Sequence, residues 1–367
     1  MKIAVDAREL EGHRTGVGRY LHELLRAFAA TAAPRAHEFV LCSSAPIDVT
    51  AYEDLRIRSV NEPGRGVAWE QLTLRTVLKR EQPDLLFAPG YTSPLWTSTP
   101  TVLVVHDVSF SSHPEWFSWR EGARRRIITR LAARKAARVV TVSRFSKSEI
   151  EAHLGVAPAR ISVIPNGVTR LATTPATGGR QPTVLYVGSI FNRRHVPALI
   201  DAVALLARRG VDVDLEIVGD NRTSPRIDLR HHAVVADVPD HVRIRSYVTD
   251  TELADCYSRA GVFAFLSEYE GFGLTPLEAL SAGVPIVVLD GPTTREVYGE
   301  AATFVTAPTP VAIAAGIERA LFDEDERRRV LGLADDVLAR HSWNSSAAQL
   351  LELFADVARD SDRSHDI

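Results

Sequence analysis

The stretch from Glu270 to Glu278, which reads Glu-Gly-Phe-Gly-Leu-Thr-Pro-Leu-Glu, has the residue types needed to hold a negatively charged ligand. It follows the apolar run Val262–Leu266, which predicts a strand, and it opens a helical pattern. Gly271 and Gly273 allow a close approach of the backbone, and the first turn of a helix presents free N–H groups and the positive end of its dipole. We therefore expect a nucleotide diphosphate at this helix start.

Part of the same stretch also fits a simpler role in starting the helix. Thr275 as N-cap, Pro276 at the first helical position and Glu278 three residues after the cap would form a capping box. This interpretation accounts for Glu278 alone as well as ligand binding does. It leaves Glu270 and the two glycines before the cap, Gly271 and Gly273, without a role, so the stretch as a whole favours a binding site.

Two adjacent arginines follow the strand predicted at Val184–Val187. Gly188-Ser189 comes directly after this run, and Arg193 and Arg194 stand a few residues further on. Arginine pairs with phosphate oxygens through two parallel hydrogen bonds. An arginine pair on a loop is more often only solvated. The carboxyl end of a strand is where parallel α/β sheets bind ligands, however, and this position favours a diphosphate contact.

His106 stands directly after the strand predicted at Thr101–Val105 and is followed by Asp107. A lone buried histidine is usually structural. At the carboxyl end of a strand, a histidine can instead hydrogen-bond a reacting sugar or an acceptor. The position therefore favours a functional role for His106.

A weaker signal is the Gly16-Val17-Gly18 sequence that follows the first predicted strand. The loop between Asp6 and Gly16 is too long for the tight turn of a dinucleotide-binding motif. Leu21 also occupies the place of that motif's third glycine. The pattern speaks against a nicotinamide-dependent enzyme.

Short β-branched runs alternate with helical patterns along the whole chain, which predicts an α/β fold with parallel sheets covered on both faces. A break rich in glycine and proline at residues 166–182 indicates an interdomain linker. We therefore predict two doubly wound, Rossmann-like domains that face each other across a cleft. The predicted strands lie at 3–6, 39–42, 85–88, 101–105, 139–142, 161–164, 184–187, 215–218, 242–245, 262–266, 286–289 and 303–305.

Length and composition agree with this organisation. The 367 residues correspond to two domains at about 150 residues each. A hydrophobic content of 45% and a charged content of 24% are typical of soluble globular proteins, and the longest apolar runs are far shorter than the roughly 20 residues of a membrane-spanning helix. The N-terminus does not resemble a signal peptide. The two cysteines, Cys42 and Cys256, form no disulfide framework and fit a reducing cytoplasm.

The small net charge of −3 conceals an asymmetry between the two halves. Residues 1–170 carry 24 Lys and Arg against 17 Asp and Glu, which gives +7, whereas residues 171–367 carry 19 against 29, which gives −10. A basic first half indicates an anionic partner, such as a phosphorylated substrate or a membrane surface. Nucleic acid is disfavoured because no basic run is interleaved with aromatic residues.

These stretches together resemble the retaining GT-B glycosyltransferases of family 4, also called group 1, over nearly the whole chain. The two glutamates of 270–278 are the most specific mark of that family. The motif style is similar to that of bacterial mannosyl- and rhamnosyl-type transferases of polysaccharide assembly, so GDP-mannose is the first expected donor and a UDP-sugar the next. The other matching stretches are 15–20 (TGVGRY), 69–71 (WEQ), 106–107 (HD), 114–115 (PE), 141–150 (VTVSRFSKSEI), 163–168 (VIPNGV), 186–189 (YVGS), 282–285 (AGVP), 295–297 (REV) and 341–343 (HSW).

The resemblance implies a role for each matching residue of the second half. Glu270 would contact the donor sugar near its reacting face, and Glu278 would hold the ribose hydroxyls. Tyr247-Val248 falls where the family places the loop that binds the base. The backbone that would cradle sugar and phosphate belongs to Phe272, Gly273, Leu274 and Thr275. Gly188 and Ser189, which follow the strand predicted at Val184–Val187, would also contribute to the donor site.

The resemblance also implies how the leaving group is stabilised. Arg193 and Arg194 would neutralise the departing diphosphate in place of the metal that GT-A enzymes use, so no metal or other cofactor is expected. His106 would lie beside the transferred sugar, and Gly16 and Gly18 would close over the donor phosphates. The family usually has lysine where Arg194 stands, and this departure puts the geometry of the donor contact in question.

The expected domains are an acceptor-binding domain at 1–170, a donor-binding domain at 171–342, a helix at 343–360 that crosses back to the first domain, and a polar tail at 361–367. A metal-dependent GT-A enzyme would need an Asp-x-Asp motif, and Asp212-Val-Asp214 lies at the amino end of its strand, which is the wrong edge. Two alternatives to a transferase stay open. One is a non-catalytic sugar-nucleotide-binding scaffold on this fold, and the other is a GT-B epimerase or hydrolase that acts on the nucleotide sugar.

A peripheral contact with an anionic membrane, at the inner face of the cell membrane, is a further hypothesis. Trp116-Phe117-Ser118-Trp119 precedes an arginine-rich helical stretch at 120–138 that includes Ile127, Ile128 and Leu131. The simpler interpretation is a helix whose apolar residues pack on the core and whose basic face is solvated. We favour the second interpretation on sequence alone.

Overall fold

Two parallel sheets organise the chain, and the computed structural model describes all residues except 13–15, 32–35, 171–179 and 366–367. One unit comprises Met1–Gly167 together with Ser342–Ile367, and the other comprises Val168–His341. We call them the N-terminal unit and the C-terminal unit. Their division after Gly167 lies close to the boundary predicted after residue 170, and the middle of the predicted linker lies outside the described residues.

The sheet of the N-terminal unit starts in its centre and is built outward in both directions. Its strand order is β3-β2-β1-β4-β5-β6-β7, and all neighbouring strands are parallel. The chain therefore reverses its direction of winding between β1 and β4, which is where such sheets open a binding crevice. The strands are β1 (Lys2–Asp6), β2 (Glu38–Ser43), β3 (Arg56–Asn61), β4 (Leu85–Ala88), β5 (Thr101–Val104), β6 (Arg138–Thr141) and β7 (Ile161–Val163).

The sheet of the C-terminal unit repeats this plan with one strand fewer. Its order is β10-β9-β8-β11-β12-β13, again all parallel, so the winding reverses between β8 and β11. The strands are β8 (Thr183–Val187), β9 (Asp214–Val218), β10 (Val242–Arg245), β11 (Val262–Phe265), β12 (Ile286–Leu289) and β13 (Thr303–Val305). The predicted α/β class and the two doubly wound domains are confirmed.

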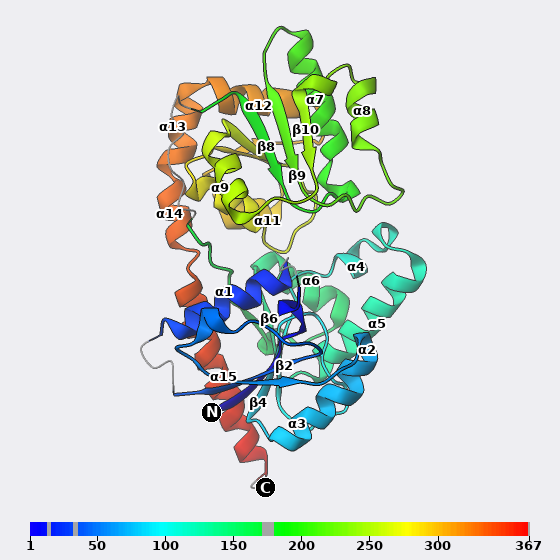
Figure 1. The fold of residues 1–367 in the computed structure, drawn as a ribbon, viewed down its shortest axis with the longest axis vertical. Coiled ribbons are helices and arrows are strands. Elements are labelled where there is room, and N and C mark those ends of the chain that lie inside the picture. Colours follow the sequence, from blue (N-terminus) through cyan, green and yellow to red (C-terminus); the bar gives the residue numbers. More distant parts are fainter. Residues whose placement is uncertain (13–15, 32–35, 171–179, 366–367) are drawn as a thin grey trace. The chain divides into compact units, whose positions relative to one another are not determined.

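Helices cover both faces of each sheet (Figure 1), which explains why the central strands are apolar along their whole length. The helices of the N-terminal unit are α1 (Val17–Ala29), α2 (Gly66–Ala68), α3 (Arg75–Glu81), α4 (Ser109–Ser112), α5 (Trp119–Lys135), α6 (Arg144–Leu154) and α15 (Trp343–His365). Those of the C-terminal unit are α7 (Val196–Arg208), α8 (Leu229–Val235), α9 (Asp250–Arg259), α10 (Leu274–Ser281), α11 (Pro292–Tyr298), α12 (Pro310–Phe322), α13 (Glu324–Gly332) and α14 (Ala334–Ala339).

Strand β3 is the element that the sequence patterns miss. It reads Arg-Ile-Arg-Ser-Val-Asn and lies at the edge of its sheet, paired only with β2. Four of its six residues are exposed, so it lacks the apolar run that identifies a buried strand. Charged side chains on an edge strand also discourage pairing with other chains.

Helix α15 is distant in sequence from the rest of the N-terminal unit but packs within it, against α1. Its Phe354 is fully buried, and its ring lies 5.2 Å from that of Phe87 and 6.3 Å from that of Phe28. The helix runs on to His365, so the polar tail predicted from residue 361 is helical as far as this residue. Residues 360–365 contain no glycine or proline that would end a helix.

Candidate functional site

Arg194 and Glu270 form an ion pair at the carboxyl ends of β8 and β11. Nε and Nη2 of Arg194 each lie 2.8 Å from Glu270 Oε1, and Nη1 donates a hydrogen bond of 2.7 Å to the carbonyl of Ser189. The guanidinium also lies over the Phe265 ring, 4.9 Å from its centroid. Burial alone would lower the pKa of Arg194, but the Glu270 carboxylate raises it above its ordinary value, so the side chain is cationic.

Only one oxygen of Glu270 is used in holding this geometry. Oε1 accepts from Arg194 and also from the Ser267 hydroxyl at 2.8 Å, while the Thr293 hydroxyl donates to the Glu270 carbonyl at 2.9 Å. In the part of the chain that the structure describes, no hydrogen bond or ion pair reaches Oε2, and the Glu270 side chain keeps 16% of its exposure. Oε2 is therefore available to accept a hydrogen bond from a ligand hydroxyl.

The loop after β8 needs glycine for two reasons. Gly188 has φ of 140°, and a Cβ atom there would lie 2.9 Å from Nη1 of Arg194. The backbone carbonyl of Gly188 in turn lies so close to Gly219, after β9, that a side chain at Gly219 would collide with it. The two glycines let the backbone pack tightly beneath Arg194.

The start of α10 differs from the capping box expected at Thr275–Glu278, and this expectation is wrong. The helix begins at Leu274, its N-cap is Gly273, and no side chain caps it. Gly273 adopts φ of 91°, which glycine accepts readily, and any side chain there would collide with the Tyr298 hydroxyl. Because no side chain caps it, the first turn from Leu274 to Thr275 can direct N–H groups at a ligand, as the nucleotide prediction requires.

Glu278 lies inside α10 rather than at its cap. Glu278 is 2% exposed, and the Tyr257 hydroxyl of α9 donates to its Oε2 at 3.1 Å. The Tyr257 ring is also fully buried and stacks on Phe263 of β11. Tyr257 thus holds the Glu278 carboxylate in place from a neighbouring helix.

The remaining predicted residues of the C-terminal unit differ in exposure. Arg193 lies over the Phe191 ring at 4.4 Å and donates to the Tyr269 carbonyl at 3.4 Å, beside the Arg194–Glu270 pair. Tyr247 is 68% exposed and follows β10 together with Val248. Phe272, in contrast, is buried and meets the His341 ring edge to face.

In the N-terminal unit, His106 lies at the carboxyl end of β5, as predicted. Its Nε2 is 2.9 Å from the Pro89 carbonyl, and its ring meets the Tyr20 ring edge to face at 4.8 Å. Burial lowers the pKa of His106, although the Pro89 carbonyl and the Asp107 carboxylate act in the opposite direction. The imidazole is therefore neutral near pH 7 and donates from Nε2.

The predicted glycine loop is mostly the first turn of a helix. Gly16, with φ of 51°, is the N-cap of α1, and Gly18 is a buried residue within that helix. Thr15, at the start of the matching stretch, lies outside the described residues. From Gly16 onward, this segment offers a helix N-terminus to a ligand.

A buried charge network at the end of β1 was not foreseen as a unit. Arg8 donates to both oxygens of Asp6, at 2.9 and 2.6 Å, and to Glu70 at 2.8 Å. Glu70 also accepts from the Thr92 hydroxyl at 2.6 Å, and the Arg8 guanidinium lies over the Trp69 ring at 4.7 Å. Trp69 and Glu70 thus connect the end of β1 with the segment that follows β4.

Three further residues of the C-terminal site were missed. Ser267 is the second residue after β11, so the rule that ligands bind beyond strand carboxyl ends could have identified it. Tyr257 and Tyr298 carry no such signal because each is a buried aromatic residue on a separate helix. Their hydroxyls become important only once the fold brings them to Glu278 and Gly273.

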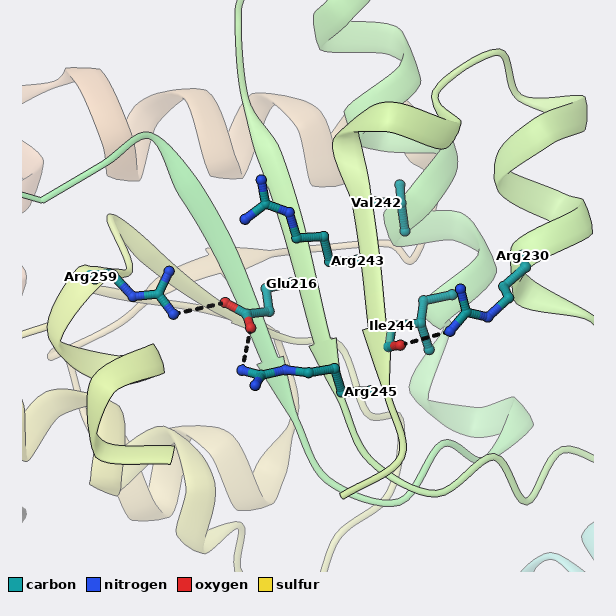
Figure 2. Close-up of a pocket in the computed structure, with 7 residues that line it drawn as sticks. All are labelled: Glu216, Arg230, Val242, Arg243, Ile244, Arg245 and Arg259. Atoms are coloured by element: carbon teal, nitrogen blue, oxygen red, sulfur yellow. Dashed lines mark hydrogen bonds and ion pairs between the residues drawn. The ribbon is translucent and has the colours of Figure 1, made fainter. Parts of the chain in front are cut away.

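A hollow of about 460 Å³ along β10 does not belong to this site (Figure 2). Arg245 Nη2 lies 2.6 Å from Glu216, Arg259 lies 3.8 Å from the same carboxylate, and Arg259 also pairs with Asp255 at 3.1 Å. The positive charges of Arg245 and Arg259 are therefore compensated within the protein, and the Arg230 guanidinium donates to the Ile244 carbonyl. We assign no ligand to this hollow.

A second hollow, of about 500 Å³, lies beyond the carboxyl ends of β9 and β10 and has the position expected of a ligand site. Its lining includes Gly219, Asp220, Arg226 and Ser246, and Ser246 directly precedes Tyr247. Among the described residues, no three His, Cys, Asp or Glu side chains are grouped so that they could hold a metal ion. The described residues also include no helix long and apolar enough to cross a membrane.

Comparison with known proteins adds the family. Residues 14–170 match the family model described as Glycosyltransferase Family 4, and residues 173–332 match the one described as Glycosyl transferases group 1. The chain is similar to a GDP-mannose:cellobiosyl-diphosphopolyprenol alpha-mannosyltransferase of Komagataeibacter xylinus, with 30% identity over 67% of this chain and 64% of the relative. It is also 30% identical to a D-inositol 3-phosphate glycosyltransferase of Pseudarthrobacter chlorophenolicus, over 60% of this chain and 56% of that protein. These alignments thus span less than two thirds of the relatives' length.

Two solved structures share the fold over nearly the full length. Sucrose-phosphate synthase from Thermosynechococcus elongatus superposes with a TM-score of 0.77 at 19% identity, covering 97% of this chain and 98% of that one. Anabaena HepE in complex with UDP and glucose superposes with a TM-score of 0.74 at 18% identity, covering 97% of this chain and all of the other.

Proposed function

This chain belongs to the family 4, group 1 glycosyltransferases of GT-B fold, and from that premise we propose that it transfers a sugar from a nucleotide diphosphate to a saccharide or lipid-linked acceptor with retention of anomeric configuration. The observation that carries the proposal is the Arg194–Glu270 pair beside the uncapped start of α10. A cation for a departing phosphate and a carboxylate oxygen for a sugar hydroxyl stand next to each other there.

The donor site is the carboxyl edge of the C-terminal sheet. Arg193 and Arg194 bind the diphosphate, and the N–H groups at the start of α10 add hydrogen bonds and dipole to the same charge. Glu278 holds the ribose, and Oε2 of Glu270 accepts from a hydroxyl of the donor sugar. We propose GDP-mannose as the donor, supported by the mannosyltransferase relatives, with a UDP-sugar as the next candidate.

The reaction requires stabilisation of charge on both sides of one breaking bond. When the bond between the anomeric carbon and the phosphate oxygen breaks, negative charge develops on the diphosphate and positive charge on the sugar ring. The fixed Arg194 guanidinium stabilises the first without reorganising. The acceptor hydroxyl attacks from the face that the phosphate leaves, and its proton passes to the leaving phosphate oxygen as the new C–O bond forms.

The N-terminal unit supplies the acceptor side in this proposal. Its carboxyl edge carries neutral His106, whose Nε2 donates to the Pro89 carbonyl and whose Nδ1 can accept a hydrogen bond without adding charge. The excess of basic residues in the first half suits an acceptor that bears phosphate, such as a sugar linked to a lipid diphosphate. Because such an acceptor lies at a membrane surface, we propose that the protein works as a peripheral membrane protein at the cytoplasmic face.

Metal-independent turnover is part of the same proposal. Arg193 and Arg194 would provide the positive charge that a divalent ion provides in metal-dependent transferases. Unchanged turnover after chelation would support this part, and a requirement for Mn²⁺ or Mg²⁺ would contradict it.

The test combines donor binding with donor turnover. Purified protein is heated with GDP-, UDP-, ADP- and dTDP-sugars without metal, and slow hydrolysis of each donor is measured in parallel. We expect one nucleotide class to raise the melting temperature and to be hydrolysed, with hydrolysis lost in Glu270→Ala. The Glu326→Ala variant, which removes an ion-paired glutamate of α13, serves as a matched control for loss of a carboxylate.

The outcomes separate the alternatives. Binding of a nucleotide sugar without any turnover, even with candidate acceptors, would favour the scaffold. Rapid conversion of the donor without an acceptor would favour an epimerase or hydrolase. Absence of any stabilisation at millimolar donor would reject the proposed donor site.

A further inference from the structure

Helix α5 packs on the N-terminal unit through small residues. Its buried face leaves little room for large side chains, and a Cβ atom added at one of its positions would already meet Phe117 at 3.3 Å. The buried positions are Gly122, Thr129, Ala132 and Ala133. The favoured expectation that the apolar residues of this helix pack on the core is therefore wrong for Ile127 and Leu131, which are exposed.

The outward face of α5 carries the bulky apolar side chains instead. Ile127 is 60% exposed and Leu131 is 43% exposed. With Arg120 and Arg124 they occupy positions i, i+4, i+7 and i+11, which fall on one side of a helix. The result is an apolar strip between basic side chains, facing away from the core.

The charge on this helix is strongly one-sided. Its 17 residues include seven basic side chains and one acidic side chain, Glu121, whose carboxylate is paired with Arg125 at 2.8 Å. Arg120, Arg124 and Arg130 are exposed and make no hydrogen bond or ion pair with any described residue. These three guanidinium groups are free to meet an anionic surface.

Tryptophans lie at both ends of the helix. Trp119 is its first residue and is 79% exposed, and Trp96 is 62% exposed beside its last residue, where the Lys135 ammonium lies 5.8 Å from the Trp96 ring. At 1.5 Å per residue the helix is about 24 Å long. Indole rings favour the boundary between lipid chains and headgroups.

We propose that this surface, formed by α5 and Trp96, docks the protein onto a membrane rich in anionic lipid. Ile127 and Leu131 insert at the headgroup boundary, Trp96 and Trp119 anchor the two ends, and Arg120, Arg124 and Arg130 pair with lipid phosphates. The inference deepens the proposed function, because it rests on the acceptor being lipid-linked, and it names the surface that brings the enzyme to that acceptor.

An anionic membrane fits this surface better than a protein partner does. Arginine and tryptophan are also common at protein interfaces, so the arrangement of the residues decides. Here arginines flank the apolar strip along the helix, and exposed tryptophans lie at both of its ends. Three unpaired cations beside exposed aliphatic and indole side chains match the two contributions, apolar burial and electrostatic attraction, that hold an interfacial helix.

The test is flotation of the full-length protein with vesicles, without any substrate. Vesicles of phosphatidylcholine are compared with vesicles of phosphatidylcholine and phosphatidylglycerol, at low and high salt. We expect flotation only with the anionic vesicles, weakened at least about tenfold at high salt, because the Debye length falls to about 3 Å at molar ionic strength. The Ile127→Glu/Leu131→Glu variant should lose binding by about tenfold or more.

A matched control uses an exposed apolar pair elsewhere. Val234 and Val235 of α8 are 59% and 72% exposed, and Val234→Glu/Val235→Glu adds the same two charges. This variant should float like the unmodified protein. Melting temperature and circular dichroism check that both variants are folded.

Equal behaviour with neutral and anionic vesicles, or undiminished flotation of Ile127→Glu/Leu131→Glu, would overturn the inference. Self-association that this variant abolishes, measured by sedimentation, would also overturn it, because the surface would then bind a second copy. Donor hydrolysis in solution is read separately, so failure of membrane binding is distinguishable from failure of the proposed transferase activity.

Discussion

The two units share one topology, yet their binding edges are built differently. In the C-terminal unit, the charged groups form ion pairs with each other. The pair of Arg194 and Glu270 fixes the orientation of both side chains before a ligand binds. In the N-terminal unit, the strand ends carry a neutral histidine and an internally balanced network around Arg8, and three arginines without a partner among the described residues lie on α5. A diphosphate of constant shape suits the first arrangement, whereas a varied, membrane-borne acceptor suits the second.

The largest effect is expected from the C-terminal unit. Arg194→Ala should lower the rate of transfer roughly 10²- to 10³-fold, because it removes a fixed donor to the charge that develops on the leaving phosphate. It also leaves Glu270 without its cation. Steady-state kinetics with the donor identified by melting would measure this. Arg194→Lys should restore part of the rate by keeping the charge without the two-pronged geometry.

Arg328→Ala is the control for that variant, since Arg328 is an exposed arginine of α13 that pairs with Asp325 at 2.7 Å. Surface pairs contribute little to stability, so its rate should match that of the unmodified protein. If Arg194→Ala transferred sugar at more than a tenth of the original rate, the fixed cation would not be the source of the C-terminal unit's chemistry.

The next effect tests the N-terminal unit. His106→Ala should lower kcat about 10- to 100-fold through loss of a hydrogen bond in the transition state. Stabilisation of the protein by donor should not change, since the proposed contacts to the diphosphate lie in the C-terminal unit. A loss of donor stabilisation in this variant would contradict the proposal that the C-terminal unit alone binds the donor.

A smaller effect is expected at Glu278, which is proposed to hold the ribose. Glu278→Gln should raise the donor KM about tenfold because a charged acceptor becomes neutral. Tyr257→Phe should raise it only a few-fold, through loss of the hydroxyl that positions Glu278 at 3.1 Å. An unchanged KM for Glu278→Gln, together with a lowered kcat, would show that Glu278 acts in the chemical step and not in donor binding.

The smallest effect concerns pH, and both units contribute to it. Burial lowers the pKa of His106 and of His341 below the ordinary value of 6.5. Well above pH 6.5 both imidazoles are neutral in the folded and in the unfolded chain. Below it, the unfolded chain takes up protons more readily than the folded one, so stability should fall as the pH drops through and below 6.5.

Thermal melting between about pH 7.5 and pH 5.5 measures that decline. His341→Gln should weaken the pH dependence of the stability of the C-terminal unit. His106→Gln should do the same for the N-terminal unit. A melting temperature that rises on acidification would contradict burial of neutral imidazoles in both.

Sequence patterns predicted most of this fold because strands buried on both faces of a parallel sheet consist of uninterrupted apolar runs. They failed at β3, whose exposed edge carries arginine and serine. They placed Arg194 and Glu270 at strand ends but could not foresee that the two side chains meet, since 76 residues separate them. The capping box failed because Gly273 adopts a left-handed conformation that starts the helix earlier, and a sequence does not display dihedral angles.

The α5 surface shows a different kind of limit. Isoleucine and leucine on a helix normally mark its buried face, and only packing shows that Gly122 and Ala132 occupy that face instead. Hydrophobic periodicity cannot tell the inner side from the outer side when both carry apolar residues.

The packing of α15 also has a consequence for the order in which the protein takes shape on the ribosome. The C-terminal unit is one continuous segment, Val168–His341, and can fold once that segment has emerged. The N-terminal unit is synthesised earlier but lacks Phe354, which fills the space between Phe28 and Phe87, until α15 follows. The half that is made first is therefore completed last, and until then Phe28 and Phe87 stay open to chaperones and to misassembly.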